Sequence, residues 1–237
     1  MRWLALALAA LALAGCETTA EKSAKLEKAA KRLAVAGNGL LITHPSTDVK
    51  VLQTTVLQGS EGAAAVVRLS NVSSHTLRDV PIAITVKDAG GHTLFQNNAP
   101  GLEAALVSVP SLPAHGEASW VDDQLPASGK PASVSALVGQ APTAAGGAPQ
   151  IGIQGIHVIE DPSRGIGTSA RLSNHSRVAQ QNLVVFAVAR RGGKLVAAGR
   201  AVLGEVAAGA SMSFEVFYVG DPRGAQLAMS APPTTFR

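Results

Sequence analysis

The sequence predicts an all-β protein with two tandem antiparallel β-sandwiches behind a short N-terminal helix. Three observations predict this fold. Beyond residue 48, short Val/Ile/Leu/Thr runs alternate with clusters of Gly, Pro, Asn and Ser, as strands alternate with turns. The tetrapeptide RLSN occurs at Arg68 to Asn71 and again at Arg171 to Asn174, 171 − 68 = 103 positions later. Between the two copies lies the segment APTAAGGAPQ, which has the composition of a linker.

The first 16 residues, MRWLALALAALALAGC, have the composition of an export signal. Arg2 supplies an early positive charge, and the apolar run after it is shorter than the ~20 residues that a transmembrane helix needs. The last four residues, Leu13-Ala14-Gly15-Cys16, resemble the lipobox of bacterial lipoproteins. That resemblance implies cleavage between Gly15 and Cys16 and acylation of the Cys16 thiol. We therefore expect a lipoprotein signal peptide over residues 1–15.

Cys16 is the only cysteine of the chain, so no intramolecular disulfide is possible. Two or three acyl chains on this one residue would provide the stable anchoring that a single chain does not give. The alternative is an ordinary secretory signal with an incidental cysteine. We expect a membrane partner through acylated Cys16, and a location at the periplasmic or extracellular face of the cell envelope.

Residues 16–37 have the composition of a helix, with Ala, Lys, Glu and Leu and no Pro or Gly before Gly37. Thr18 and Glu21 fit a capping box at its start. Two interpretations compete: a solvated spacer ~30 Å long, or a helix lying on anionic lipid heads through its basic residues. The narrow apolar stripe favours the spacer. The stripe consists of Leu26, Ala30 and Leu33, and the basic residues are Lys25, Lys28 and Arg32.

The two RLSN copies predict strands of the same phase. Apolar residues occupy every second position, so one face of each strand is expected to be buried. Asparagine suits the end of a strand because its side chain hydrogen-bonds the backbone that follows. We expect Leu69 and Leu172 to face a core, Arg68 and Arg171 to face water, and Asn71 and Asn174 to end each strand.

A hairpin signal follows each RLSN copy. An alternating strand runs into a glycine pair, Gly90-Gly91 or Gly192-Gly193, and a second strand begins at Leu94 or Leu195. The glycine pairs start 19 and 18 residues after their asparagines, so one gap aligns the segments. The residues expected to face inward are Ile82, Ile84 and Val86 in the first copy, and Val184, Phe186 and Val188 in the second.

The similarity continues downstream in the same order. LPAHG (112–116) precedes a strand bearing Trp120, VAAG (206–209) precedes a strand bearing Phe214, and each half closes with an apolar strand ending in Ala-Pro. Five matches in register indicate an internal repeat. We therefore predict two immunoglobulin-like sandwiches, over residues 38–142 and 150–237, joined by a linker at 143–149. Their expected core residues are Leu69, Ile82, Ile84, Val86 and Trp120, and Leu172, Val184, Phe186, Val188 and Phe214.

The same succession of segments resembles the FxLYD-type immunoglobulin-like modules of bacterial and archaeal envelope proteins. In the first half the matching stretches are Asn71-Val72-Ser73, residues 84–90 and residues 112–116. The second half departs at Arg190-Arg191, where an aspartate is expected, and at Val206-Ala207, where Leu-Pro is expected. The resemblance implies a non-catalytic adhesion or scaffold module with an envelope protein or cell-wall partner.

Candidate chemical sites are few. His157, Glu160 and Asp161 could form part of a metal site, although an exposed strand end is the simpler interpretation. The pair Asp122-Asp123 could bind a cation or a basic partner. The Asn-x-Ser patterns at 71–73 and 174–176 match glycosylation acceptors, but the repeat already places them in turns. No nucleophile elbow and no dinucleotide loop are present.

The basic residues are scattered and the net charge is only +4, which argues against a nucleic-acid partner. The main expectation is a lipid-anchored envelope protein, without enzymatic activity or cofactor, that displays two sandwiches for binding or scaffolding. One alternative is an envelope hydrolase or metal-dependent enzyme with an inter-domain site at His157, Glu160 and Asp161. The other is a carrier of a small apolar ligand.

Overall fold

The computed structural model describes residues 39–59, 62–126 and 129–236, and residues 39–237 form one compact unit. The all-β prediction is confirmed, because the described residues form antiparallel sheets and one helix of four residues. In this part of the chain no helix combines the length and apolar character of a membrane span. The predicted signal peptide, the lipidation site at Cys16 and the helical spacer at 16–37 lie outside the described residues.

Strands β1 to β7 belong to the first half of the repeat and strands β8 to β14 to the second. The first half contains β1 (Val49–Gly59), β2 (Gly62–Asn71), β3 (Leu77–Asp88), β4 (Thr93–Gln96), α2 (Ala104–Val107), β5 (Ser108–Leu112), β6 (Glu117–Leu125) and β7 (Pro131–Val138). The second half contains β8 (Ile151–Asp161), β9 (Gly165–Asn174), β10 (Gln180–Arg191), β11 (Lys194–Val206), β12 (Ser211–Phe217), β13 (Val219–Gly220) and β14 (Gln226–Ser230).

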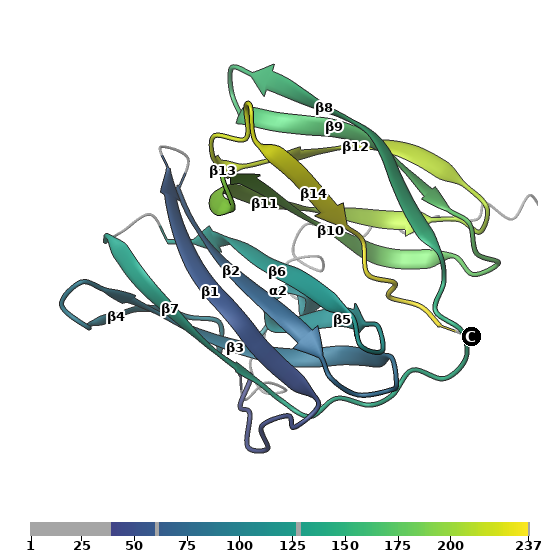
Figure 1. Cartoon of the computed structure of the whole chain (residues 1–237), viewed down its shortest axis with the longest axis horizontal. Helices are drawn as coiled ribbons and strands as arrows, with labels where there is room; N and C mark the ends of the chain where they lie inside the picture. The colour runs from purple at the N-terminus through teal and green to yellow at the C-terminus, as the bar shows by residue number, and fades with distance from the viewer. Residues whose placement is uncertain (1–38, 60–61, 127–128, 237) are drawn as a thin grey trace, which may run out of the picture. The chain divides into compact units, whose positions relative to one another are not determined.

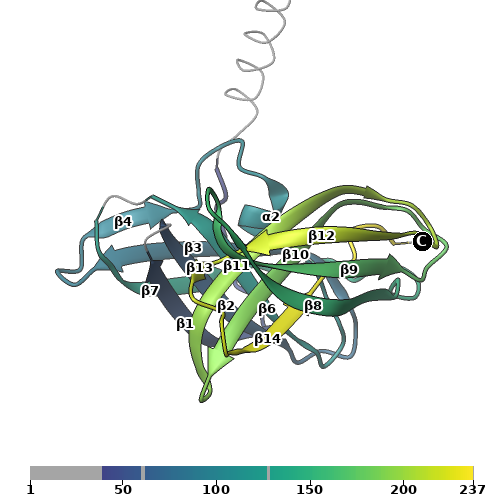
Figure 2. The same ribbon diagram turned by 90° about the horizontal axis from the view of Figure 1, so that it is seen from above.

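Each half is a sandwich of two sheets (Figure 1). In the first half, β1-β2-β6 lies over a sheet in which β3 pairs with β4, β5 and β7. In the second half, β12-β9-β8 lies over β13-β11-β10-β14. Every pairing between the described strands is antiparallel, and no sheet that they form contains strands from both halves. Seen from above, α2 stands beside the strands and not within a sheet (Figure 2).

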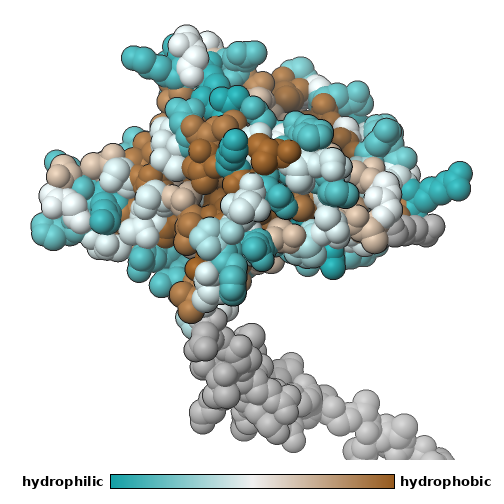
Figure 3. Space-filling view, turned by 60° about the horizontal axis from the view of Figure 1, so that its bottom comes forward, coloured by the Kyte–Doolittle hydropathy of each residue, from teal (hydrophilic) through white to brown (hydrophobic). Residues whose placement is uncertain are grey.

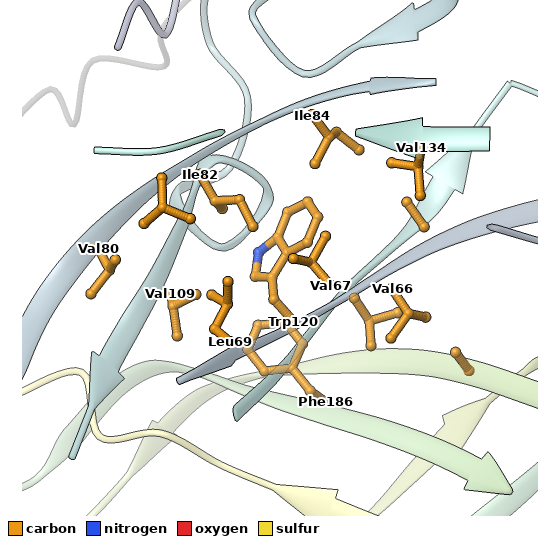
Figure 4. Packing of buried hydrophobic residues seen from close by; sticks show 14 of the residues in the cluster. Val66, Val67, Leu69, Val80, Ile82, Ile84, Val109, Trp120, Val134 and Phe186 are labelled. Carbon is orange, nitrogen blue, oxygen red and sulfur yellow. The ribbon is translucent and has the colours of Figure 1, made fainter. Parts of the chain in front are cut away.

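The two halves share one hydrophobic cluster, because sheet β1-β2-β6 packs against sheet β13-β11-β10-β14. Strand β2 is buried without interruption from Ala63 to Val67, and β10 from Leu183 to Ala189. In a strand with one solvated face, buried and exposed residues alternate. In a strand that is covered on both faces, consecutive residues are apolar and buried. Figure 4 shows Phe186 of β10 among the buried side chains of the first half, next to Trp120 of β6.

This packing corrects one prediction. Val184, Phe186 and Val188 are buried, but they belong to the cluster of the first half and not to the core of the second sandwich. The core of the second sandwich takes the other face of β10, with Leu183, Val185, Ala187 and Ala189. The prediction was wrong because a strand buried on both faces carries no alternation from which its phase can be read.

The structure also shows where the gap in the repeat falls. Strands β2 and β9, and strands β3 and β10, correspond with a constant shift of 103 residues, so the gap does not precede β10. It falls in the hairpin turn after the strand. In the second half Arg191 pairs with Lys194 across Gly192 and Gly193, whose φ angles of 56° and 78° suit a two-residue turn. In the first half the corresponding turn is longer, over residues 89–92.

The first half carries an insertion that the second lacks. Strand β11 continues unbroken where the first half has β4, a loop, α2 and β5. The buried side chain of Asn97 holds the insertion, since Oδ1 accepts from the Ile84 N–H at 2.7 Å and Nδ2 donates to the Leu106 carbonyl at 2.7 Å. Trp120 Nε1 donates to the Ala105 carbonyl at 2.8 Å. The insertion is therefore fixed to the core of the first sandwich.

The other core predictions are confirmed. Both strands that bear RLSN bury their leucine and turn their arginine outward, where Arg68 pairs with Glu117 at 2.6 Å. The confirmed core residues are Leu69, Ile82, Ile84, Val86, Trp120, Leu172 and Phe214, each no more than 6% exposed.

The asparagine that closes the first RLSN copy holds three chain segments together. Asn71 is 1% exposed, and its Nδ2 donates to the carbonyls of His75 at 2.8 Å, Leu112 at 3.2 Å and Pro113 at 2.9 Å. Its Oδ1 accepts from the Ser73 N–H at 2.9 Å, which is the turn that the sequence predicts. The end of β2 is thereby tied both to the loop that follows it and to the turn after β5.

The second copy repeats this arrangement bond for bond. Asn174, also 1% exposed, donates to the carbonyls of Val178 at 2.8 Å, Val206 at 3.1 Å and Ala207 at 3.1 Å. Its Oδ1 accepts from the Ser176 N–H at 3.1 Å. The repeated tetrapeptide is therefore structural, and the buried amide nitrogens of Asn71 and Asn174 are occupied within the chain, which argues against glycosylation there.

Candidate functional site: the groove between the two halves

A groove of ≈ 440 Å³ runs along the junction of the two halves, and we call it the inter-half groove. It is of the size that holds a small molecule or a peptide side chain. The first half contributes Asp79, Glu103, Ala104, Ala105, Ser108 and Pro110, and the second contributes Gln181, Asn182, Val202 and Thr234. The insertion of the first half therefore forms part of its wall.

Two residues at equivalent places in the repeat line this groove. Asp79 of β3 and Asn182 of β10 are separated by the repeat shift of 103, and both have positive φ, 49° and 48°. Asp and Asn tolerate this conformation better than other non-glycine residues. The flanking strand pairs place Asp79 opposite Pro110, which has no N–H to donate to the ladder. They place Asn182 opposite Gly204. Each residue thus interrupts its ladder at the groove.

A buried arginine of the second half connects the halves beside the groove. Arg200 of β11, whose side chain is 4% exposed, donates from Nε to Asp123 Oδ1 at 3.1 Å and from its backbone N–H to Oδ2 at 2.9 Å. Its Nη1 donates to Glu103 Oε2 at 3.0 Å. These bonds join β11 to β6 and to the insertion. Because charge-assisted bonds in a buried setting are strong and directional, they fix the relation between the groove walls.

The carboxyl group of Asp122, the residue before Asp123, makes no hydrogen bond to Arg200 among the described contacts. Asp122 is 1% exposed, and its Oδ1 accepts from the Gln124 N–H at 3.0 Å. Its Oδ2 has no hydrogen-bond partner among the described residues. Burial raises the pKa of Asp122 to about 6, against the lowering effect of the Gln124 N–H and Arg200. Burial also raises the pKa of Asp123, although Arg200 opposes this.

A register irregularity separates the roles of these two aspartates. Between the pairs Ala65–Asp122 and Ala63–Leu125, β6 has one residue more than β2. Such a bulge redirects a side chain, and here it accompanies the contact of Asp123 with β11. The sequence analysis considered a cation or a basic partner for the pair Asp122-Asp123. For Asp123 the basic partner is Arg200 of the same chain.

The groove offers oxygen-rich binding groups beside apolar lining residues. Carboxylates come from Asp79 and Glu103, side-chain amides from Gln181 and Asn182, and hydroxyls from two further residues, Ser108 and Thr234. The ten described lining residues include no histidine, cysteine, lysine or arginine. This chemistry suits recognition of a hydrogen-bond donor or a cation.

The predicted metal-site residues are not brought together as a site. His157, Glu160 and Asp161 lie along β8, away from the groove lining. Glu160 accepts from Arg223 Nη1 at 3.0 Å. Asp161 accepts from Ser163, and this bonding lowers its pKa. In the described ranges no group of three His, Cys, Asp or Glu side chains is placed to hold a metal ion.

The sequence reasoning missed the residues that build the groove. Arg200 and Glu103 belong to no recognisable sequence motif. The two residues form an ion pair although they are 97 positions apart. Two signals were present. The distance from Leu94 to Leu112 is 18 residues, against 11 from Leu195 to Val206, which locates the insertion. The shift of 103 that joins the RLSN copies also joins Asp79 to Asn182.

On the face shown in Figure 3, apolar areas are interrupted by hydrophilic side chains. Exposed large apolar side chains are spread over several elements of both halves, and Val202 is the one that also lines the groove.

No protein-family model matches the chain, and no curated protein matches it in sequence. Among solved structures, the exo-chitosanase CsxA of Amycolatopsis orientalis is 16% identical, with a TM-score of 0.28 over 76% of this chain and 26% of the enzyme chain. Red sea bream transglutaminase is 16% identical, with a TM-score of 0.24 over 92% of this chain and 32% of that chain. This chain thus spans about a quarter to a third of the length of the solved structures that it matches.

Proposed function

We propose that this protein is an exported, lipid-anchored cell-envelope protein that displays two immunoglobulin-like sandwiches for non-catalytic binding or scaffolding. The observation that carries the proposal is the inter-half groove on a unit whose halves share a core. A site formed by two packed sandwiches keeps its shape without the partner, which limits the entropy lost on binding.

The sequence supports the anchoring part of the proposal. Leu13-Ala14-Gly15-Cys16 ends a signal-like run, and Cys16 is the only cysteine of the chain. Acylation of its thiol would hold the protein at a membrane, and the Lys- and Ala-rich stretch after it would act as the spacer.

The groove chemistry supports binding over catalysis. General acid–base or nucleophilic catalysis needs a nucleophile and a base within hydrogen-bond reach. The described lining has carboxylates, amides and hydroxyls but no histidine to activate Ser108 or Thr234. The carboxyl whose pKa is raised to about 6 belongs to Asp122, which is buried and not part of the groove lining.

The test of anchoring is mass spectrometry of the N-terminal peptide of protein taken from membranes, together with fractionation of a Cys16→Ser variant. We expect a peptide that begins at an acylated Cys16, and a Cys16→Ser variant that no longer carries acyl chains and loses stable membrane association. An N-terminal peptide that begins elsewhere, or an unmodified Cys16 in membrane-bound protein, would contradict the proposal.

A further inference from the structure

We propose that the inter-half groove binds an alkylammonium group, such as the side chain of lysine or a related diamino acid in a peptide. This inference rests on the binding function proposed above and specifies the chemistry of its ligand. It follows from the charges and the exposure of the lining residues and from the apolar residues among them.

The charge of the groove is acidic. Asp79 and Glu103 supply two carboxylates, and no basic side chain belongs to the described lining. Each carboxylate has one arginine partner outside the lining. Glu103 Oε2 is paired with Arg200, whose side chain is 4% exposed and also bonded to Asp123, and Asp79 Oδ2 is paired with the adjacent Arg78 at 3.3 Å. An incoming cation therefore competes with Arg78 for Asp79, and meets Glu103 Oε1 and the uncharged acceptors of the lining.

Both carboxylates remain accessible. The side chain of Glu103 is 59% exposed, and its bond to Arg200 uses only Oε2. The side chain of Asp79 is 65% exposed, and its contact with the adjacent Arg78 is a 3.3 Å pair through Oδ2. An exposed pair of that kind contributes little free energy, so Asp79 can exchange it for a ligand.

The apolar part of the lining explains why an amine on an apolar stem fits better than an inorganic cation. Ala104, Ala105, Pro110 and Val202 line the groove with small apolar surface. Lysine-like chains pack their methylene groups on such surface and keep the ammonium group at its polar edge. The amide oxygens of Gln181 and Asn182 add acceptors for the three ammonium hydrogens.

The repeat suggests two substitutions that change the charge of the groove and suit the positive φ angle of each position. Asp79 and Asn182 occupy equivalent positions with nearly identical positive φ, so each position accepts the residue found at the other. Asp79→Asn removes one groove carboxylate, and Asn182→Asp adds one. Asp48→Asn removes an exposed carboxylate of the first half that is not part of the groove, and is the matched control.

The test is isothermal titration of purified lipidated protein in detergent at low salt. The probes are 1,5-diaminopentane and the peptide Ala-Lys-Ala with both ends blocked. We expect saturable binding that weakens roughly two- to five-fold in Asp79→Asn, tightens in Asn182→Asp and is unchanged in Asp48→Asn. Stronger binding of the peptide would identify a peptide side chain as the ligand, and equal or stronger binding of the diamine would identify a free amine.

Absence of saturable binding by either probe would overturn the inference, and so would an Asp48→Asn effect as large as that of Asp79→Asn, which indicates unspecific attraction. Either result would leave the acylation of Cys16 untouched, so failure of this inference is distinguishable from failure of the anchoring part of the proposed function. A circular dichroism spectrum equal to that of the wild type establishes that each variant is folded.

Discussion

Arg200 and Asp123, 77 positions apart and in different halves of the repeat, form a two-point contact in which both carboxylate oxygens accept from the same residue. The arginine side chain is 4% exposed and the aspartate side chain 18%. With the cluster around Phe186, this contact makes the two sandwiches a single body. The groove walls therefore depend on contacts that cross the repeat.

Arg200→Ala should destabilise the protein by about 3 kcal/mol, because it leaves the buried Asp123 carboxylate without its partner. Arg200→Lys should cost less, since it keeps the charge but loses the planar donor geometry. Urea unfolding followed by tryptophan fluorescence measures both losses. Arg177→Ala, an exposed arginine of the second half, is the control. Equal stability of Arg200→Ala and Arg177→Ala would show that the contact does not join the halves.

Asp122 should make stability depend on pH. Its pKa is raised from 3.8 to about 6 in the folded protein. A raised pKa means that the folded state holds the proton more tightly, so this contribution is complete below pH 4 and is lost as pH rises through 6. We expect Asp122→Asn to remove up to about 3 kcal/mol of this dependence between pH 4 and 7.

The measurement is the free energy of unfolding at several pH values in wild type and Asp122→Asn. Subtracting the two curves cancels the contribution of other groups, including Asp123, whose pKa is raised as well. A difference between the curves that does not change with pH would contradict the assignment.

Phe186→Ala should weaken the packing between the two halves so that they unfold in separate transitions. Phe186 is 2% exposed and packs in the first-half cluster although it belongs to the second half. Loss of a buried phenylalanine costs about 3–5 kcal/mol. Calorimetry should show one transition in the wild type and two in the variant. Phe217→Ala, a half-buried phenylalanine of the second half that carries Arg164 on its ring, should keep one transition. A single transition in Phe186→Ala, with unchanged stability, would contradict the shared core.

Asn71→Ala and Asn174→Ala should lower the free energy of unfolding by similar amounts, on the order of 3 kcal/mol. Each substitution removes the amide that donates hydrogen bonds to buried carbonyls. The equality follows from the matching sets of hydrogen bonds around the two side chains. Asn98→Ala, exposed in the first half, should change stability by less than about 0.5 kcal/mol. Thermal unfolding measures all three. An asparagine variant as stable as Asn98→Ala would refute the structural explanation of RLSN.

Much of the fold follows from local patterns in the sequence. The positions of Leu69 and Leu172 could be predicted because each lies between polar residues in an alternating stretch, and those of Trp120 and Phe214 because each is a large aromatic residue in an expected strand. Val184, Phe186 and Val188 could not be assigned to a face, because both faces of β10 are covered. The pattern contains no information on which layer covers which face.

The candidate site depends on contacts between distant segments, and these leave weaker traces in the sequence. Glu103 lies in an insertion that only the unequal spacing of the repeat indicates, and Arg200 resembles any exposed strand arginine. Asp123 was recognised as a candidate for a basic partner, but not the partner itself. The lipid-anchor prediction at Cys16 depends on a contiguous motif and needs no fold.

The central claim is that a lipid-anchored, rigid pair of sandwiches binds an envelope partner through the inter-half groove. Its most direct test is in-cell crosslinking from a photo-reactive amino acid placed at Gln181 in the groove, compared with the same amino acid at exposed Leu137 of β7. We predict a specific crosslinked partner from position 181 that is lost in a Cys16→Ser background. Identical crosslinks from both positions, or crosslinks independent of Cys16, would contradict the claim.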